Sequence, residues 1–187
     1  KGEGVNHRLG KHLLAIVAEG QKNRLYISPN QVHVAASEVE RPKNIPVETI
    51  PYDPRNLWTP AYGLTKFSDL FTNRQLVALT TFSDLVGQAR QRVLEDALAA
   101  GMEEGESLEA GGSGARAHSD AIATYLALAV SRLADYSNSL CTWNTKRETI
   151  THLFTRQAIP MTWDITEANP FSHSSGNFLG QLEWVAK

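Results

Sequence analysis

The stretch "LFTNRQLVALTTFSDLVGQARQRVLEDALAAG", residues 70–101, decides the fold class, because it predicts one long helix. Thr72 is suited to cap the N-terminus of this helix, and Gly101 follows its last apolar position. Apolar residues recur at intervals of three or four and form one continuous stripe: Leu76, Leu79, Phe82, Val86, Ala89, Val93 and Ala97. The stripe marks the side of the helix that we expect to be buried.

Further helices are predicted after this one. A Gly- and Glu-rich loop, "GMEEGESLEAGGSGAR", separates it from a second long helix over about residues 118–138. The stretch "AIATYLALAVSRLA" is apolar almost all round, which predicts a helix in the middle of a bundle. Thr145 and Glu148 fit a capping box in "TKRE", so we expect a third helix that Pro160 ends. The apolar residues Ile150, Leu153, Phe154 and Ala158 would form its buried side.

The N-terminal part of the chain follows a different pattern. The runs "HLLAIVAEG" and "NRLYISP" predict a small β-hairpin, and Asn30 is suited to cap a short helix after it. Residues 41–62 hold five prolines, which favours an extended arm. We therefore predict an α+β, mostly α fold, in which a small β-hairpin lobe precedes a helical lobe of three to four helices with one long helix pair. The expected boundary separates residues 1–62 from residues 63–187.

Composition gives little direct indication of function. A net charge of −2 and a pI near 6.3 provide no global attraction to nucleic acid, so any such contact must use a local patch. The single Cys141 cannot form an internal disulfide, and no apolar run approaches the ~20 residues that span a bilayer. These features predict a cytoplasmic protein. Because the chain starts at Lys1 and stops inside an apparent helix, we expect it to be a fragment of a longer protein.

The motifs of catalysis and metal binding are missing from the sequence. None of the six histidines, His7, His12, His33, His118, His152 and His173, pairs with another histidine or the cysteine at a helical ligand spacing. The "GGSG" at residues 111–114 has no preceding strand and no following Lys-Ser/Thr, so we interpret it as a linker. Asn169, Pro170 and Phe171 nearly spell the (Asp/Asn)-Pro-Pro-(Tyr/Phe) signature of DNA amino-methylases, but one proline is absent. We expect a turn there, with no catalytic, cofactor or metal residue in this chain.

Several basic residues at helix starts indicate a partner anion. Arg74 and Gln75 lie in the first predicted turn after Thr72, and cations there oppose the helix dipole. Internal salt bridges to Asp69, Asp84, Asp135 or Glu148 would explain such residues equally well. If the chain contacts nucleic acid, the candidate residues are Lys66, Arg74, Gln75, Lys146, Arg147, Arg156 and Gln157. The tryptophans Trp58, Trp143, Trp163 and Trp184 could stack on bases, although we expect them to serve mainly in packing.

Three long segments resemble a known family. Residues 63–86, 125–144 and 154–178 are similar to the middle portion of large prokaryotic adenine-specific DNA methylases that carry a zinc ribbon. The resemblance covers about two thirds of the chain, from Tyr62 onward. It implies that the glycine-rich methyl-donor motif, the ribbon cysteines and the Asp-Pro-Pro-Tyr motif all lie outside this chain.

The resemblance implies a role in an S-adenosylmethionine-dependent DNA amino-methyltransferase, acting on adenine N6 or cytosine N4. This chain would be a mostly helical insert that shapes the DNA cleft or the target-recognition surface. The parent protein would bind S-adenosylmethionine and DNA, whereas no cofactor is expected for this fragment. The partners of the chain would be DNA and the remaining methyltransferase domains. The alternative is a non-catalytic helical module for protein interaction or assembly.

Overall fold

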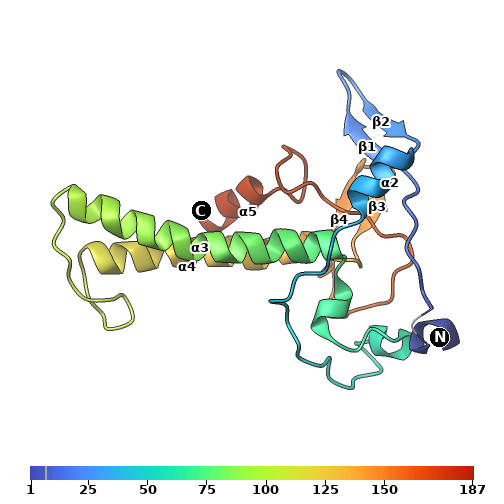
Figure 1. Cartoon of the computed structure of the whole chain (residues 1–187), viewed down its shortest axis with the longest axis horizontal. Helices are drawn as coiled ribbons and strands as arrows, with labels where there is room; N and C mark the ends of the chain where they lie inside the picture. Colours follow the sequence, from blue (N-terminus) through green and yellow to red (C-terminus); the bar gives the residue numbers. More distant parts are fainter. Residues whose placement is uncertain (7) are drawn as a thin grey trace. The chain divides into compact units, whose positions relative to one another are not determined.

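The computed structural model describes residues 1–6 and 8–187, so His7 lies outside the described residues. The fold is α+β and mostly α, as predicted (Figure 1). The chain forms two compact units. The first unit comprises Lys1–Val77 and Asn138–Glu167, and the second comprises Ala78–Ser137 and Ala168–Lys187. The units do not divide at residue 62, because residues 138–167 return to the hydrophobic cluster built by residues 50–71.

The predicted N-terminal hairpin is confirmed. Strands β1 (Ile16–Glu19) and β2 (Arg24–Ile27) pair antiparallel, with Val17 opposite Tyr26. Helix α2 (Gln31–Ser37) follows, and the Asn30 side chain accepts a hydrogen bond from the His33 backbone N–H at 3.0 Å. The His33 Nδ1 accepts one from the Asn30 N–H in return, at 3.2 Å. These reciprocal bonds satisfy amides that the first turn of a helix leaves unpaired.

The predicted third helix is wrong. Residues 142–151 form a second hairpin, in which β3 (Thr142–Asn144) pairs antiparallel with β4 (Thr149–Thr151). The Asn144 side chain accepts hydrogen bonds from the Lys146 and Arg147 amides at 3.1 and 3.0 Å. This local turn competes with the capping box that Thr145 and Glu148 would form, and Glu148 adopts a φ of 48° within it. The β-branched threonines and Ile150 favour the strands.

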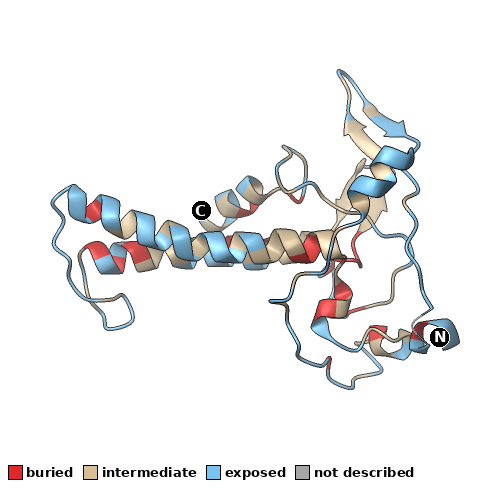
Figure 2. Cartoon of the chain, viewed as in Figure 1, coloured by how far each residue is buried: buried red, intermediate tan, exposed pale blue. Residues whose placement is uncertain are grey.

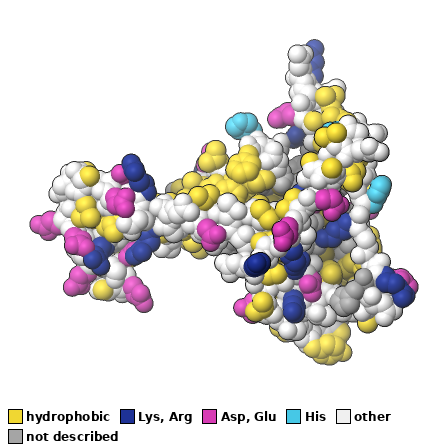
Figure 3. All heavy atoms as spheres, in the orientation of Figure 1, with side chains coloured by type: hydrophobic (Ala, Val, Ile, Leu, Met, Phe, Trp, Pro, Cys, Tyr) yellow, Lys and Arg dark blue, Asp and Glu magenta, His cyan; other side chains and the backbone are white. Residues whose placement is uncertain are grey.

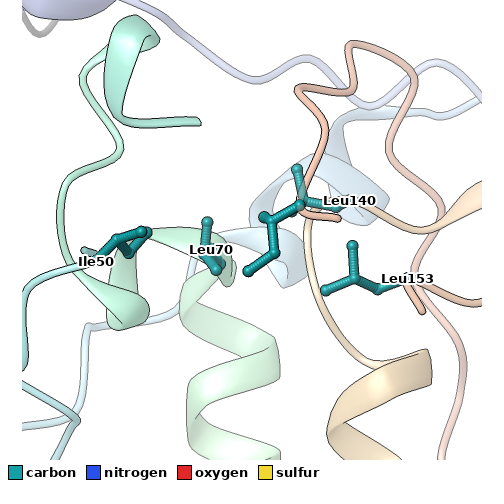
Figure 4. Packing of buried hydrophobic residues seen from close by; sticks show 5 residues of the cluster. Ile50, Leu70, Leu140 and Leu153 are labelled. Carbon is teal, nitrogen blue, oxygen red and sulfur yellow. The ribbon is translucent and has the colours of Figure 1, made fainter. Parts of the chain in front are cut away.

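A small apolar cluster forms the core of the first unit (Figure 4). It contains Ile50, Leu70, Leu140, Leu153 and Ile159, packed against Leu57, Leu64 and Phe71. Two backbone hydrogen bonds hold the segments of this cluster together. The Ser139 N–H donates to the Leu70 carbonyl at 2.7 Å, and the Ile50 N–H donates to the Thr65 carbonyl at 2.8 Å. Cys141, a free cysteine, is also buried in this unit.

The proline-rich arm wraps this cluster and leads into a short 3-10 helix. Residues 41–58, all within the described part of the chain, hold isolated bridges but no helix or longer strand. The arm ends in η1 (Thr59–Tyr62), and helix α1 (Gly2–Val5) packs on it. A side chain at Gly4 would place its Cβ only 2.0 Å from the Tyr62 carbonyl oxygen, so this approach requires glycine. A second 3-10 helix, η2 (Phe67–Leu70), precedes the first long helix.

The long helices are confirmed at positions close to those predicted. Helix α3 (Asn73–Ala99) begins directly after Thr72, and α4 (Ala115–Tyr136) follows the loop. In the second unit an ion pair of 2.6 Å between Arg90 and Asp120 joins α3 to α4. Helix α5 (Phe178–Val185) begins after its Asn177 cap and packs against α4. None of the helices within the described residues has the length and apolarity to cross a bilayer.

Helix α4 does not lie in the middle of a bundle, contrary to prediction. Ala129 and Leu133 are buried on one side of it, but Ile122, Tyr125 and Leu128 are exposed (Figure 2). The helix has too few neighbours in the second unit to cover its whole circumference. It therefore retains an apolar face that is open to solvent.

Shortening a core side chain should test the cluster of the first unit. Leu140 is only 5% exposed, so Leu140→Ala should lower the free energy of unfolding by about 2 to about 5 kcal/mol, through lost burial and a cavity. The matched control is Leu14→Ala, because Leu14 is 75% exposed and its removal should leave stability almost unchanged. Urea denaturation followed by circular dichroism measures both. Equal midpoints for the two variants would contradict the assignment of this core.

Candidate nucleic-acid interface

Positive charge is concentrated in the first unit. It holds 13 Lys and Arg against 10 Asp and Glu, whereas the second unit holds 5 against 10. The first unit is therefore net positive and the second net negative, although the whole chain carries only −2. All seven candidate residues for nucleic-acid contact belong to the first unit. A polyanion would therefore be attracted to the first unit and repelled by the second.

Arg74 and Gln75 are engaged inside the protein. The Arg74 guanidinium forms a bidentate pair with Glu167, at 2.8 Å from Nε to Oε2 and 3.0 Å from Nη2 to Oε1, and it also donates to the Ser37 carbonyl. Its partner is therefore none of the four carboxylates considered from the sequence. Gln75 is buried, and its side-chain oxygen accepts from the Thr72 N–H at 2.8 Å while the Thr72 hydroxyl accepts from the Gln75 N–H. This Thr-x-x-Gln capping box was visible in the sequence and indicates a structural role for Gln75.

Two more cations, which sequence reasoning missed, lie around the Arg74–Glu167 pair. The pKa of Lys11 is lowered, mainly because desolvation disfavours its charged form, while Glu167 opposes this shift and Arg74 and Arg41 add to it. Arg41 donates to the Ser68 carbonyl at 3.2 Å and lies 3.8 Å from the Asp69 carboxylate. The three cations Lys11, Arg41 and Arg74 thus lie near two carboxylates, those of Asp69 and Glu167, close to the start of α3. No motif connects these positions, so only the fold could bring them together.

Lys146 and Arg147 occupy the turn of the β3–β4 hairpin instead of a helix start. Both side chains are exposed, and both backbone amides are tied to Asn144. The base of the turn is braced by the Tyr26 hydroxyl, which donates to Glu148 Oε1 at 3.2 Å and accepts from Trp143 Nε1 at 3.3 Å. The Tyr26 and Trp143 rings meet edge to face at 6.4 Å. Two adjacent cations are therefore presented on a turn that two hairpins support.

The other candidates lie on loops. Arg156 and Gln157 are exposed, and the Arg156 guanidinium lies 5.5 Å from the centroid of the Trp58 ring. The Trp58 N–H donates to the Ile159 carbonyl at 3.0 Å, and the Ile159 N–H donates to the Asn56 carbonyl at 2.8 Å, which holds the two loops together. Lys66 is exposed just before η2, where its backbone N–H donates to Asp69. Within the described residues, no ion pair engages Lys66, Lys146, Arg147 or Arg156.

Beside Trp58 lies an open pocket of about 490 Å³, which we call the aromatic pocket. Its walls include Lys1, Tyr52, Asp53, Trp58, Pro60 and Tyr62. The Lys1 ammonium lies 5.6 Å from the Tyr62 ring centroid, and Trp163 meets Tyr62 edge to face at 5.6 Å. Trp58, Trp163 and Trp184 each contact another side chain, as expected of packing residues, but all three also remain partly exposed. The pocket could not be predicted from the proline-rich sequence, because that sequence has no periodic pattern that would show which side chains lie together.

A second pocket, of about 570 Å³, lies in the second unit. Its charged groups Arg90 and Asp120 pair with each other, and the Leu108 amide and Arg90 lower the pKa of the Asp120 carboxyl. The "GGSG" loop nearby offers no free helix terminus, because the first amides of α4 donate to the Glu103 and Glu104 carbonyls at 2.8 and 3.0 Å. The charged groups Arg90 and Asp120 of this pocket are therefore already paired with each other and are not free to bind a ligand.

The chain was compared with protein-family models, curated proteins and solved structures. No match was found in any of them. The family resemblance therefore stays a prediction from the sequence.

Two sequence features concern whether this chain could perform chemistry itself, namely its metal-ligand side chains and the near-signature at Asn169. No cluster of three His, Cys, Asp or Glu side chains there could hold a metal ion. The near-signature at Asn169 forms the predicted turn, in which its side-chain oxygen accepts from the Phe171 N–H at 3.0 Å. The Phe171 ring lies 5.8 Å from the ring of Phe82 and is largely exposed.

A double-mutant cycle should measure the Arg74–Glu167 pair. Because the pair is bidentate and partly buried, Arg74→Ala and Glu167→Ala should show a coupling of about 1 kcal/mol in the free energy of unfolding. The control cycle uses Arg92 and Asp96, an exposed pair on α3 whose coupling should be only about 0.3 kcal/mol. Denaturant titration gives both values. Equal couplings would mean that the bidentate geometry contributes no additional stability.

Proposed function

We propose that this chain is the DNA-contacting, mostly helical part of an S-adenosylmethionine-dependent DNA amino-methyltransferase, and that it serves target binding rather than chemistry. The observation that carries the proposal is the pair Lys146 and Arg147, exposed on a braced turn in the net positive unit. The sequence resemblance supplies the class of enzyme.

The geometry suits contact with phosphates. Lys146 and Arg147 are consecutive in the chain, and their turn is held by Asn144, so their backbone is ordered before a ligand arrives. Preorganisation reduces the entropy lost on binding. Contacts of this kind neutralise phosphates and release counterions, so binding should be salt-dependent and insensitive to sequence. Lys66 and Arg156 would add to the same attraction, whereas Arg74 and Gln75 would act by stabilising the fold.

S-adenosylmethionine and the catalytic residues would belong to other domains of the parent enzyme. The remaining methyltransferase domains would be its partners, and the cytoplasm, where DNA is accessible in a prokaryote, would be its compartment.

Charge reversal at the hairpin turn tests the proposal. The double variant Lys146→Glu and Arg147→Glu should weaken binding of a labelled DNA duplex, and by the same factor whatever the sequence of the duplex. The slope of log K against log salt should fall by about 2, because about one phosphate contact is lost for each cation. Fluorescence anisotropy at several salt concentrations measures both quantities.

The matched control reverses two exposed arginines of the acidic unit, Arg92 and Arg116, and so changes the net charge equally. Its binding should stay close to that of the unmodified chain. If both double variants lost affinity equally, the effect would come from net charge alone, and the turn would have no special role.

The exposed face of α4 supports the alternative of a protein-interaction module. Ile122, Tyr125 and Leu128 follow one another at intervals of three, and each is at least 37% exposed. Figure 3 shows further hydrophobic side chains gathered over α5. Exposed apolar patches of this kind often mark sites of protein contact. The two functions are compatible, because the cations and this face belong to different units.

A single charge placed on this face tests the alternative. If α4 mediates self-association, the chain should form dimers at high concentration, and Leu128→Glu should return it to a monomer by introducing an unpaired charge into an apolar contact. Sedimentation velocity measures the change. Gln88→Glu, at an exposed position of α3, is the control and should leave the dimer intact. A chain that is monomeric at all concentrations would exclude a self-association role for this face.

A further inference from the structure

The aromatic pocket combines flat apolar walls with positive charge at its edge. The rings of Tyr52, Trp58 and Tyr62 line it, and Tyr52 is 90% exposed. Arg156 stands over the Trp58 ring, and the Lys1 ammonium stands over Tyr62. The volume of about 490 Å³ lies within the range of about 300 to about 1,000 Å³ that is usual for small-ligand sites.

We propose that the aromatic pocket binds an unpaired nucleobase of single-stranded or locally opened DNA, by stacking the base on Trp58 and placing its phosphate beside Arg156 or Lys1. The inference deepens the proposed function, on which it rests for the choice of DNA as the polymer. Stacking on an aromatic ring is tolerant of sequence because every base has a π-face.

Charge distinguishes this ligand from a cationic one. An aromatic cage of this size could in principle hold a quaternary ammonium group. However, Arg156 and Lys1 already lie 5.5 and 5.6 Å from the centroids of two of the three rings, so an incoming cation would meet like charge. An anionic polymer would be attracted by the same charges. The same two side chains would neutralise its phosphates.

The Trp58 indole favours a base over a proline-rich peptide, because it offers a ring face and no free donor. A polyproline helix has no internal hydrogen bonds and presents free carbonyls that require donors. The Trp58 indole N–H is not available as such a donor, because it donates to the Arg55 carbonyl at 3.0 Å. This bond holds the ring in place and leaves its face as the contact surface. A base needs only that face.

Asp53 sets the orientation of the bound nucleotide. Its carboxylate lines the pocket and accepts bonds from the Arg55 N–H at 3.1 Å and from Asn56 Nδ2 at 2.9 Å. Both donors stabilise the ionised form, and a carboxylate repels phosphate. The base should therefore enter the pocket while the phosphate stays at the edge, near the cations. The ionised oxygens can also accept a hydrogen bond from an exocyclic amino group of a base.

The test measures anisotropy of a labelled single-stranded oligodeoxyadenylate with the full 187-residue chain. Trp58→Ala should weaken binding by between about fivefold and about a hundredfold, the effect of losing one stacked base. Trp58→Phe should retain most of the affinity because it keeps a ring. Tyr52→Ala should also weaken binding, and since Tyr52 is so exposed this substitution cannot act by unfolding the chain. An oligonucleotide of equal length with abasic sites should bind the unmodified chain as weakly as the normal oligonucleotide binds Trp58→Ala.

Trp184→Ala is the matched control, because Trp184 is also exposed and carries Arg132 at 4.7 Å over its ring, but lies in the second unit. It should bind the oligonucleotide as the unmodified chain does. Equal affinities of Trp58→Ala and the unmodified chain, or of the abasic and normal oligonucleotides, would overturn the inference. An oligoproline peptide whose binding needs Trp58, with oligonucleotide binding unaffected by Trp58→Ala, would overturn it as well.

The outcomes separate this inference from the proposed function. If Trp58→Ala has no effect while duplex binding remains salt-dependent and sensitive to Lys146 and Arg147, the pocket assignment fails and the proposed function stands. If the oligonucleotide binds through Trp58 but duplex DNA does not bind at all, the proposed role at a DNA cleft fails and the base pocket stands.

Discussion

The first turn of α3 is the constraint on which the first unit depends. A helix leaves four amides unpaired at its start, and here Thr72 and Gln75 satisfy two of them reciprocally in a buried place. The next residues of the turn bind distant parts of the chain: Asn73 donates to the Val39 carbonyl, and Arg74 joins Ser37 to Glu167. Two segments remote in sequence, residues 37–39 and the segment of Glu167, are thereby attached to one helix end. Because Arg74 is committed to this junction, it is unavailable as a free phosphate ligand.

The distribution of charge follows from the same arrangement. Residues 138–167 return to the first unit and bring Lys146, Arg147 and Arg156 with them, while the acidic loop near residue 105 stays in the second unit. A chain that is nearly neutral as a whole is thus divided into a basic and an acidic part. The basic part also carries the exposed rings of Trp58 and Tyr52. Positive charge beside aromatic surface is the combination that single-stranded nucleic acid requires of a protein.

Local sequence patterns correctly predicted those helices and strands for which every pattern indicates the same structure. Helix α3 has a cap, a long apolar period and a terminal glycine, so its limits were clear from residues 70–101 alone. The N-terminal hairpin and the Asn30 cap were predicted for similar reasons. The prediction of a helix over residues 142–160 was wrong because the local sequence patterns there favour different structures. Thr145 and Glu148 match a capping box, but Asn144 can form a turn with the same backbone amides, and the flanking β-branched residues favour strands.

Sequence by itself determined the fold class, the long helices and the positions of the basic residues, because these depend on the order of residue types along the chain. Tertiary structure alone decided which of those residues are free. It buried Gln75, paired Arg74 with Glu167, and left Lys146 and Arg147 on an exposed turn. It also gathered Tyr52, Trp58 and Tyr62 into one pocket and placed Arg156 over the Trp58 ring. The physical reason is that pairing and burial depend on contacts between residues far apart in sequence, such as the 93 positions between Arg74 and Glu167.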